Sequence, residues 1–401
     1  MAEELDRTNP TGPLAGHRVI DLSSVLMGPL ATQTLGDLGA DVILVEPKKG
    51  DRNRSMGTGP HHQLSGVSMN LLRNKRDICL DLTKPAARDI VLRLAATADV
   101  VVTNLRPGSL RRLRLEYDDI AAVRPDIIFC QAAGYPADGP RADDPAYDDV
   151  IQAATGVADV MDRTLGEAAL VPMLLADKVC GLTIVSSICA ALVHRALTGE
   201  GQRIEVPMID VMKAFMMTEH GSGGIAYPRT EPAGYPRILT KQRRPKRTAD
   251  GWIHMLPYSE DNWSKLLATV GREEMMSDPR FTSLRSRHLH SEFLYGELEK
   301  ILPSKTTDAW MEFCSEHGIP ATRLSTLEDL VDELPLATHP VAGEYRSVPP
   351  PVRFSATPAD VRRHAPLIGQ HNDELLTELG YTDEERRELA ATGVIGTGPE
   401  D

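Results

Sequence analysis

The sequence GHRVIDLSSVLMGPLATQTLGDLGADVILVEP, residues 16–47, decides the fold class. His17–Ser24 is a short run rich in β-forming residues and predicts a strand. Gly28–Ala40 has apolar residues at helical spacing, and Asp41–Pro47 predicts a second, buried strand. A strand, a helix and another strand in this order form the unit from which parallel sheets are built.

The alternation of strands and helices continues beyond residue 47. Further strands are predicted at Ala98–Leu105, Asp126–Tyr135 and Arg203–Met208. Helices are predicted at Pro85–Ala96, Ser109–Leu115, Asp149–Ala158 and Asp177–Leu197. Strands that alternate with helices favour an α/β fold, with a parallel sheet and helices on both of its faces.

A change in composition predicts a second compact region. Gly221–Thr248 is dense in glycine, proline, tyrosine and arginine, which predicts an irregular crossover. A strand is then expected at Asp250–Pro257. The helices expected after it are Asp261–Val270, His290–Leu302, Thr307–His317 and, beyond a linker-like stretch at His339–Ala356, Ala365–Gly380 with a cap at Asn372.

The composition is that of an ordinary globular chain, with 401 residues of which 25% are charged and 41% hydrophobic. The 44 basic and 57 acidic residues give a net charge of −13, which repels nucleic acid and anionic membranes. Five scattered cysteines without a C-x-x-C pair are predicted to be free thiols in a reducing cytosol. The polar N-terminus lacks the apolar segment of a signal peptide, and the apolar run Val179–Val193 predicts a core helix. We therefore expect a cytoplasmic protein without a nucleic-acid or membrane partner.

The turn after the first predicted strand, Val25–Leu30, contains one glycine. A dinucleotide-binding turn needs three glycines so that the backbone can approach the pyrophosphate, so the sequence disfavours NAD. The helix that begins in this turn still directs free N–H groups towards a crevice, which suits a phosphate-bearing ligand.

Basic residues gather where the loops after the predicted strands should lie, near the carboxyl ends of those strands. They are Lys48, Lys49, Arg52, Arg54, Arg73, Lys75, Arg76, Arg106, Arg111, Arg112 and Arg114. In an acidic chain, this cluster favours a site for a multiply phosphorylated ligand. Scattered surface lysines and arginines would produce the same pattern, and both interpretations stay open.

Asp177 is the strongest catalytic candidate, because it is an acidic residue between two apolar stretches at the start of a predicted helix. An aspartate there can cap the helix by accepting hydrogen bonds from free N–H groups. It can also be a carboxylate nucleophile in a dry pocket, where the same N–H groups stabilise an oxyanion. The sequence contains no Gly-x-Ser-x-Gly elbow and no cluster of metal ligands, so no metal site is expected.

The order of these segments resembles the family III CoA-transferases. This group includes formyl-CoA:oxalate and carnitine CoA-transferases and the related α-methylacyl-CoA racemases. The resemblance extends from about residue 16 to about residue 380. It is carried by GHRVIDLSSVLMGPLATQTLGDLGADVILVEPKKGD, NKRDICLDL, ADVVVTNLRPGSLRRL, AAGYPADGP, LLADKVCGLTIVSSICAALVHRALTGEGQRIEVPMID and APLIGQHNDELL.

The resemblance implies a set of site residues. The family's nucleophilic aspartate precedes a small-residue helix that ends in a TGxGQ turn, and Asp177 matches it. The residues that match family contacts to coenzyme A or, for the tyrosine, a family active-site residue are Val25, Lys48, Lys75, Asn104, Arg112 and Tyr135. The implied enzyme is an acyl-CoA:carboxylate CoA-transferase that forms a covalent aspartyl anhydride and an aspartyl-CoA thioester. Acyl-CoA and a carboxylic acid are then its substrates, and no tightly bound cofactor or metal is implied.

The resemblance also implies a fold: a Rossmann-like large domain with a parallel sheet, a smaller α+β domain, and an interlocked homodimer. The large domain is expected to begin with residues 16–220, and residues 221–247 to form the crossover linker. The small domain is expected at 248–325, and residues 326–395 to form a return linker and the C-terminal part of the large domain.

Departures from the family pattern leave alternatives open. The racemases use a His-Asp pair, and the matching stretch here has Tyr147 in place of the histidine. Proton exchange at an α-carbon needs two positioned acid–base groups, so racemisation is disfavoured. A CoA-binding subunit without catalysis is a third reading. The segment Arg237–Arg247 carries six cations, which could recognise an acceptor carboxylate, CoA phosphates or the partner chain.

Overall fold

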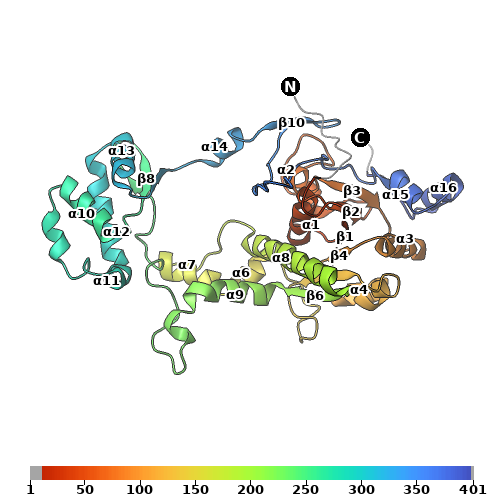
Figure 1. Cartoon of the computed structure of the whole chain (residues 1–401), viewed down its shortest axis with the longest axis horizontal. Helices are drawn as coiled ribbons and strands as arrows, with labels where there is room; N and C mark the ends of the chain where they lie inside the picture. The colour runs from red at the N-terminus through yellow and green to blue at the C-terminus, as the bar shows by residue number, and fades with distance from the viewer. Residues whose placement is uncertain (1–10, 399–401) are drawn as a thin grey trace. The chain divides into compact units, whose positions relative to one another are not determined.

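The computed structural model describes residues 11–398, which divide into two compact units (Figure 1). The large unit consists of the residues up to Ala154, Met173–Lys213, and the residues from Glu333 onward. The small unit consists of Thr155–Pro172 and Ala214–Asp332.

The large unit is built on a six-stranded parallel sheet in the order β3-β2-β1-β4-β5-β6. Its strands are β1 (Arg18–Leu22), β2 (Asp41–Glu46), β3 (Lys75–Cys79), β4 (Val100–Thr103), β5 (Ile128–Ala133) and β6 (Gln202–Pro207). The order reverses between β1 and β4, which pair with Val19 opposite Val100. Such a reversal opens a crevice at the carboxyl ends of the two strands.

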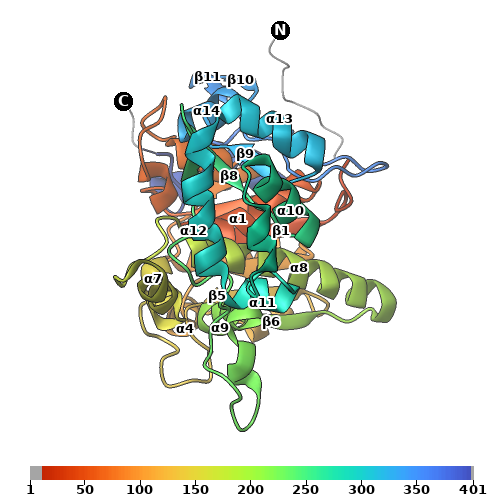
Figure 2. The ribbon, with the colours of Figure 1, turned by 90° about the vertical axis from the view of Figure 1, so that its left-hand side faces the viewer.

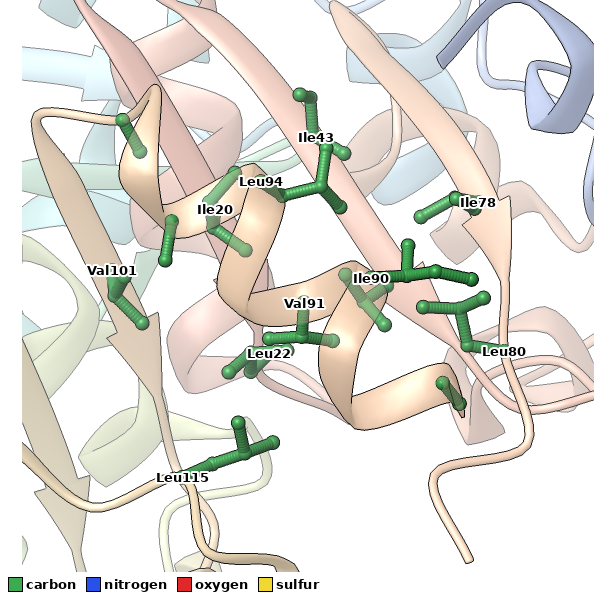
Figure 3. Packing of buried hydrophobic residues seen from close by; sticks show 14 of the residues in the cluster. Ile20, Leu22, Ile43, Ile78, Leu80, Ile90, Val91, Leu94, Val101 and Leu115 are labelled. Carbon is green, nitrogen blue, oxygen red and sulfur yellow. The ribbon is translucent and has the colours of Figure 1, made fainter. Parts of the chain in front are cut away.

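Helices cover both faces of this sheet, as the sequence predicts. On one face, α3 (Pro85–Ala96) and α15 (Asn372–Glu378) join the main apolar core. Figure 3 shows the helix residues Ile90, Val91 and Leu94 beside the strand residues Ile20, Ile43, Ile78 and Val101. On the other face, α1 (Met27–Asp37) packs on β1, β2 and α8 (Leu175–Thr198). Alternate residues of a strand point to opposite sides of the sheet. The strand residues that point towards α3 are apolar and form the core with it.

Shorter elements complete the large unit. They are η1 (Arg52–Ser55), α2 (Gly66–Leu71), α4 (Pro107–Leu113), α5 (Tyr117–Ala121), α6 (Asp148–Ala154), the first part of α9 (Met208–His220), the hairpin β10 (Leu336–His339) and β11 (Gly343–Arg346), and α16 (Asp383–Ala391). The hairpin overlaps the stretch His339–Ala356, which the sequence predicts to be a linker.

The small unit contains an antiparallel sheet in the order β7-β8-β9 with helices packed around it (Figure 2). Its strands are β7 (Lys246–Arg247), β8 (Trp252–Met255) and β9 (Ala321–Arg323). Its helices are α7 (Val157–Leu165), the end of α9, η2 (Ser222–Ile225), α10 (Glu260–Thr269), η3 (Glu273–Ser277), α11 (Leu284–Leu289), α12 (Ser291–Ile301), η4 (Leu302–Ser304), α13 (Thr307–His317) and α14 (Leu327–Asp332). Trp263, Phe281 and Trp310 are fully buried in its core.

Two predicted helices are wrong in detail. The helix predicted at Asp149–Ala158 is two helices, α6 and α7, because Gly156 takes a left-handed conformation between them with φ of 91°. The helix predicted at Ala365–Gly380 begins only at Asn372, so Asn372 is not its cap. The Asn372 side chain instead accepts the N–H of Cys79 on β3, which ties the C-terminal region to the edge of the sheet.

Helix α8 is, within residues 11–398, long and apolar enough to cross a membrane by length and composition alone. A core helix of a folded domain satisfies the same criteria. Here α8 packs against α1, β5 and β6 within the large unit.

Candidate active site

A cavity of about 320 Å³ lies where β1, β4 and β5 end, at the reversal of strand order. The residues that line it are Ser24, Val25, Leu26, Met27, Arg52, Asn104, Leu105, Arg106, Ser109, Ala133, Gly134, Asp144, Pro145, Ala146, Tyr147, Asp177 and Met208. We call it the aspartate cavity. It brings together three of the predicted site residues, Val25, Asn104 and Asp177.

Asp177 is the third residue of α8 and is partly buried. The N-cap residue of the helix is Leu174, and no side chain makes a capping hydrogen bond there. The interpretation of Asp177 as the N-cap is therefore wrong. Its carboxylate is therefore not occupied in closing the helix and reaches the cavity.

The pKa of Asp177 is raised to about 6, first by burial and then by the negative charge of Asp148. Both causes disfavour the charged form of a carboxyl group. At neutral pH the carboxylate still predominates, and it is more basic than an exposed aspartate. These are the properties of an activated oxygen nucleophile.

Asp148, at the start of α6, is the neighbour that positions this part of the chain. It is buried, and its Oδ1 accepts the Asp177 N–H at 3.1 Å. Its Oδ2 accepts the Gln152 Nε2–H at 2.5 Å. Sequence reasoning misses the role of Asp148, because that role depends on its place beside the start of α8 in the folded chain.

Val25 forms part of the cavity wall in an unusual backbone conformation. Its φ is 69°, a left-handed value that is rare for a β-branched residue. The Val25 N–H donates to the Asp51 carboxylate at 3.1 Å, and Asn53 Nδ2 donates to the Val25 carbonyl at 3.3 Å. Asp51 and Asn53 thus hold a strained turn at the site, and no local pattern in the sequence reveals this role.

Asn104 joins the ends of β4 and β1. Its Oδ1 accepts the Ser24 N–H at 2.9 Å, and its Nδ2 donates to the Ser24 carbonyl at 2.7 Å. This pair of hydrogen bonds joins two residues that both line the cavity.

A second cavity, of about 680 Å³, lies beside the first. It is lined by the loops after β1, β2 and β3 and includes Lys48 and Lys49. We call it the lysine cavity. It shares Ser24, Arg52 and Leu105 with the aspartate cavity, so the two spaces are contiguous.

The structure does not bring Lys75 to either cavity. Its side chain is fully buried, and its Nζ donates to Asp21 Oδ2 at 2.9 Å and to Thr32 Oγ1 at 2.7 Å. Arg73 and Arg76 are buried nearby in ion pairs with Asp37 and Asp41. The prediction that the basic cluster lies at the carboxyl ends of strands is wrong for these three residues, because they precede or begin β3. They form a buried ionic network instead.

Tyr135 and Arg112 lie outside the lining of both cavities. Tyr135 is buried at the end of β5, and its hydroxyl accepts a hydrogen bond from Arg141 at 2.6 Å. Arg112 is exposed on α4 and donates to Ser109 Oγ at 3.1 Å. Ser109 itself lines the aspartate cavity, which leaves Arg112 close to its rim.

The cationic segment Arg237–Arg247 is partly neutralised within the small unit. Arg244 and Lys246 both pair with Glu299, at 3.1 Å and 3.0 Å. The guanidinium of Arg237 lies 5.1 Å from the ring centre of Tyr258. Fewer than six of these charges are therefore free to meet a ligand.

No group of three or more histidine, cysteine, aspartate or glutamate side chains in residues 11–398 is placed to hold a metal ion. The five cysteines are all free, and four of them are buried.

The family model for CoA-transferase family III matches residues 14–372. The chain belongs to the family III CoA-transferases. It is a CoA-transferase enzyme of mixed α/β fold, and the substrates of such enzymes are CoA thioesters.

Named relatives match this chain over nearly their whole length. A probable fatty acyl-CoA transferase of Mycobacterium tuberculosis, Rv3272, is 32% identical over 91% of this chain and 98% of its own. The crystal structure of a mutant of Rv3272 matches with a TM-score of 0.78 and 31% identity, covering 91% of this chain and 99% of that one. A succinate–glutarate CoA-transferase of Agrobacterium fabrum is 29% identical over 93% of this chain and 97% of its own.

Proposed function

We propose that this CoA-transferase moves coenzyme A from an acyl-CoA to a free carboxylic acid through covalent intermediates on Asp177. The observation that carries the proposal is a partly buried carboxylate with a pKa of about 6, in a cavity at the switch point of the sheet.

The reaction needs no net proton transfer. An oxygen of Asp177 attacks the thioester carbonyl, the C–S bond breaks, and CoA thiolate leaves a mixed aspartyl anhydride. The thiolate then attacks the aspartyl carbonyl, the anhydride C–O bond breaks, and the first acid departs as its carboxylate. The incoming carboxylate attacks this aspartyl-CoA thioester and repeats the two steps in reverse. Each step exchanges one acyl bond for another, so the thioester energy is conserved.

The start of α8 supports this chemistry. Asp177 lies in the first turn of a 24-residue helix, where the helix dipole favours negative charge that develops during attack. Leu174 and Leu175 are half-buried beside it, and an apolar surrounding limits hydrolysis of the anhydride.

The two contiguous cavities suggest how coenzyme A is held. We place its phosphates in the lysine cavity beside Lys48 and Lys49, because cations recognise phosphate. The pantetheine arm then passes the shared edge at Ser24 and reaches Asp177 between Val25 and Asn104. Arg112 stays a proposed contact at the rim, whereas the buried Lys75 and Tyr135 act through the framework rather than by touching the ligand.

We also propose a homodimer, because large apolar side chains on α8 and α9 are exposed in the single chain. The interlocked arrangement, the domain boundaries predicted from the sequence and the cytoplasmic location stay predictions.

Substitution of Asp177 tests the mechanism. Asp177→Asn and Asp177→Ala remove the nucleophile, so CoA exchange between an acyl-CoA and an acid should fall by at least about a thousandfold. The measurement is exchange by the purified enzyme, with mass spectrometry of the adduct that hydroxylamine traps on residue 177. Asp89→Asn, an exposed aspartate on α3, is the matched control and should keep activity.

Retention of exchange by either Asp177 variant would disprove the covalent mechanism. Deuterium incorporation at the α-carbon of an acyl-CoA in heavy water, without an acceptor acid, would support the racemase instead. Tight CoA binding with neither reaction would indicate a non-catalytic subunit.

A further inference from the structure

Arg52 occupies a special place, at the junction of the two cavities. It begins η1, directly after the loop that follows β2, and it lines both the aspartate cavity and the lysine cavity. Its Nη1 donates a hydrogen bond to the Tyr147 hydroxyl at 2.8 Å. Tyr147 comes from the loop before α6 and also lines the aspartate cavity.

The charge of Arg52 is not neutralised by the protein. Its neighbours Arg54, Arg73 and Arg76 are buried and form ion pairs with carboxylates. No carboxylate lies within salt-bridge distance of the Arg52 guanidinium anywhere in the part of the chain that the structure describes. The side chain is exposed to the cavities, so an incoming anion can pair with it without displacing an internal partner.

The hydrogen bond to Tyr147 uses one N–H group and leaves the rest of the guanidinium fork free. A guanidinium carries five N–H donors in a plane and binds carboxylates through two parallel hydrogen bonds. The hydrogen bond to the Tyr147 hydroxyl fixes the direction of the Arg52 guanidinium. Both side chains line the aspartate cavity.

Arg52 does not serve Asp177 itself. A cation close to Asp177 would lower its pKa, whereas the pKa is raised by burial and by Asp148. The anion that Arg52 meets is therefore a group other than the Asp177 carboxylate. The pantetheine arm of coenzyme A is uncharged, and we place the phosphates at its far end beside Lys48 and Lys49 in the lysine cavity.

We propose that Arg52, oriented by Tyr147, binds the second carboxylate of a dicarboxylic acid, so that the enzyme selects dicarboxylic acids and their mono-CoA thioesters. This inference rests on the proposed reaction at Asp177. It makes Arg52 the residue that determines specificity, and it adds no step to the chemistry.

Binding without turnover tests the proposal. In the Asp177→Asn enzyme, the affinities of glutaryl-CoA and pentanoyl-CoA are compared by calorimetry, since the two differ at the far end of the acyl chain in a carboxylate against a methyl group. Glutaryl-CoA should bind at least about tenfold more tightly, as a charge-assisted bidentate pair would give. Adding Arg52→Gln should abolish this preference and leave pentanoyl-CoA and free CoA bound as before.

Two further variants sharpen the test. Tyr147→Phe removes the hydroxyl that orients Arg52 and should reduce the preference part of the way. Arg387→Gln, an exposed arginine on α16, should leave it unchanged. The proposal is overturned if the two thioesters bind equally before Arg52 is changed. It is also overturned if Arg52→Gln weakens both thioesters and free CoA alike, because Arg52 then binds a CoA phosphate. Since no turnover is involved, neither result depends on whether Asp177 is the nucleophile.

Discussion

Asp177 and Asp148 show how the tertiary structure tunes a single residue. Burial and a second carboxylate raise the pKa of Asp177, which makes the charged form costly and the oxygen more basic. Asp148 is placed there by its hydrogen bonds to the Asp177 N–H and to Gln152. Asp148 thus both raises the pKa of Asp177 and holds this part of the chain in place.

The pH dependence of the enzyme should depend on this pair. The proposed mechanism needs an ionised Asp177, so kcat/KM should fall as the pH drops through about 6. Asp148→Asn removes the charge that contributes to the raised pKa, so the acid limb should move to lower pH. Burial remains the larger cause, so the limb should stay above the usual aspartate value of 3.8. The measurement is kcat/KM between pH 4 and pH 9.

Asp144→Asn serves as the comparison for this experiment. Asp144 also lines the cavity, but it pairs with Arg141 and does not act on the pKa of Asp177. Its replacement should leave the position of the acid limb unchanged. An unshifted limb in Asp148→Asn would mean that Asp148 has only a structural role.

Helix α8 carries Asp177, the proposed nucleophile, and the position of the helix depends on close packing with α1. A Cβ atom placed on Gly181 would lie 2.9 Å from the Met27 carbonyl oxygen and 3.2 Å from Leu30 Cδ2. Glycine therefore allows α8 to approach α1, and Met27 is itself part of the cavity wall. The distance between the two helices fixes where Asp177 stands.

Replacing this glycine should separate packing from helix propensity. Gly181→Ala gains up to about 1 kcal/mol of propensity but forces the two helices apart, so we expect a net loss of about 1–2 kcal/mol. Gly296→Ala on α12 gains the same propensity where the nearest atoms are 3.9 Å away, and it should stabilise the protein. Urea unfolding of both variants measures the difference. Equal stabilisation by both would show that α1 and α8 are not tightly fitted.

Strand β3 shows why one element is missed by pattern alone. Its sequence KRDIC carries three charges in five residues, and such a pattern is typical of a surface segment. All five residues are nevertheless buried, because Asp21, Asp41 and the C-terminal region supply partners for the charged side chains. Only the folded chain brings those partners together.

Several large apolar side chains of the single chain are exposed. Leu182 and Val193 on α8 are each 61% exposed, and they lie eleven residues apart, about three helical turns, on one face. Phe215 and Met217 on α9 are also exposed. Exposed apolar residues that share one face of a helix, as on α8, are typical of protein interfaces and support the proposed homodimer.

We expect the protein to sediment as a dimer of 43.9 kDa chains. The double substitution Leu182→Glu with Val193→Glu should convert it to a monomer, because charges on this face oppose burial. Analytical ultracentrifugation at micromolar concentration decides between the two forms. Val123→Glu, an exposed apolar position after α5, is the control and should stay dimeric. A wild-type monomer would contradict the proposed dimer.

The amino-acid sequence by itself determined the alternation of strands and helices, the family and the candidate nucleophile. These features are written in local periodicity and in the order of short motifs, so they survive without knowledge of the fold. The tertiary structure alone decided that Lys75 is buried, that Val25 is strained and that Asp148 lies beside Asp177. It also decided that Arg52 stands between two cavities. Each of these facts depends on contacts between residues distant in the chain, which packing creates and no local pattern encodes.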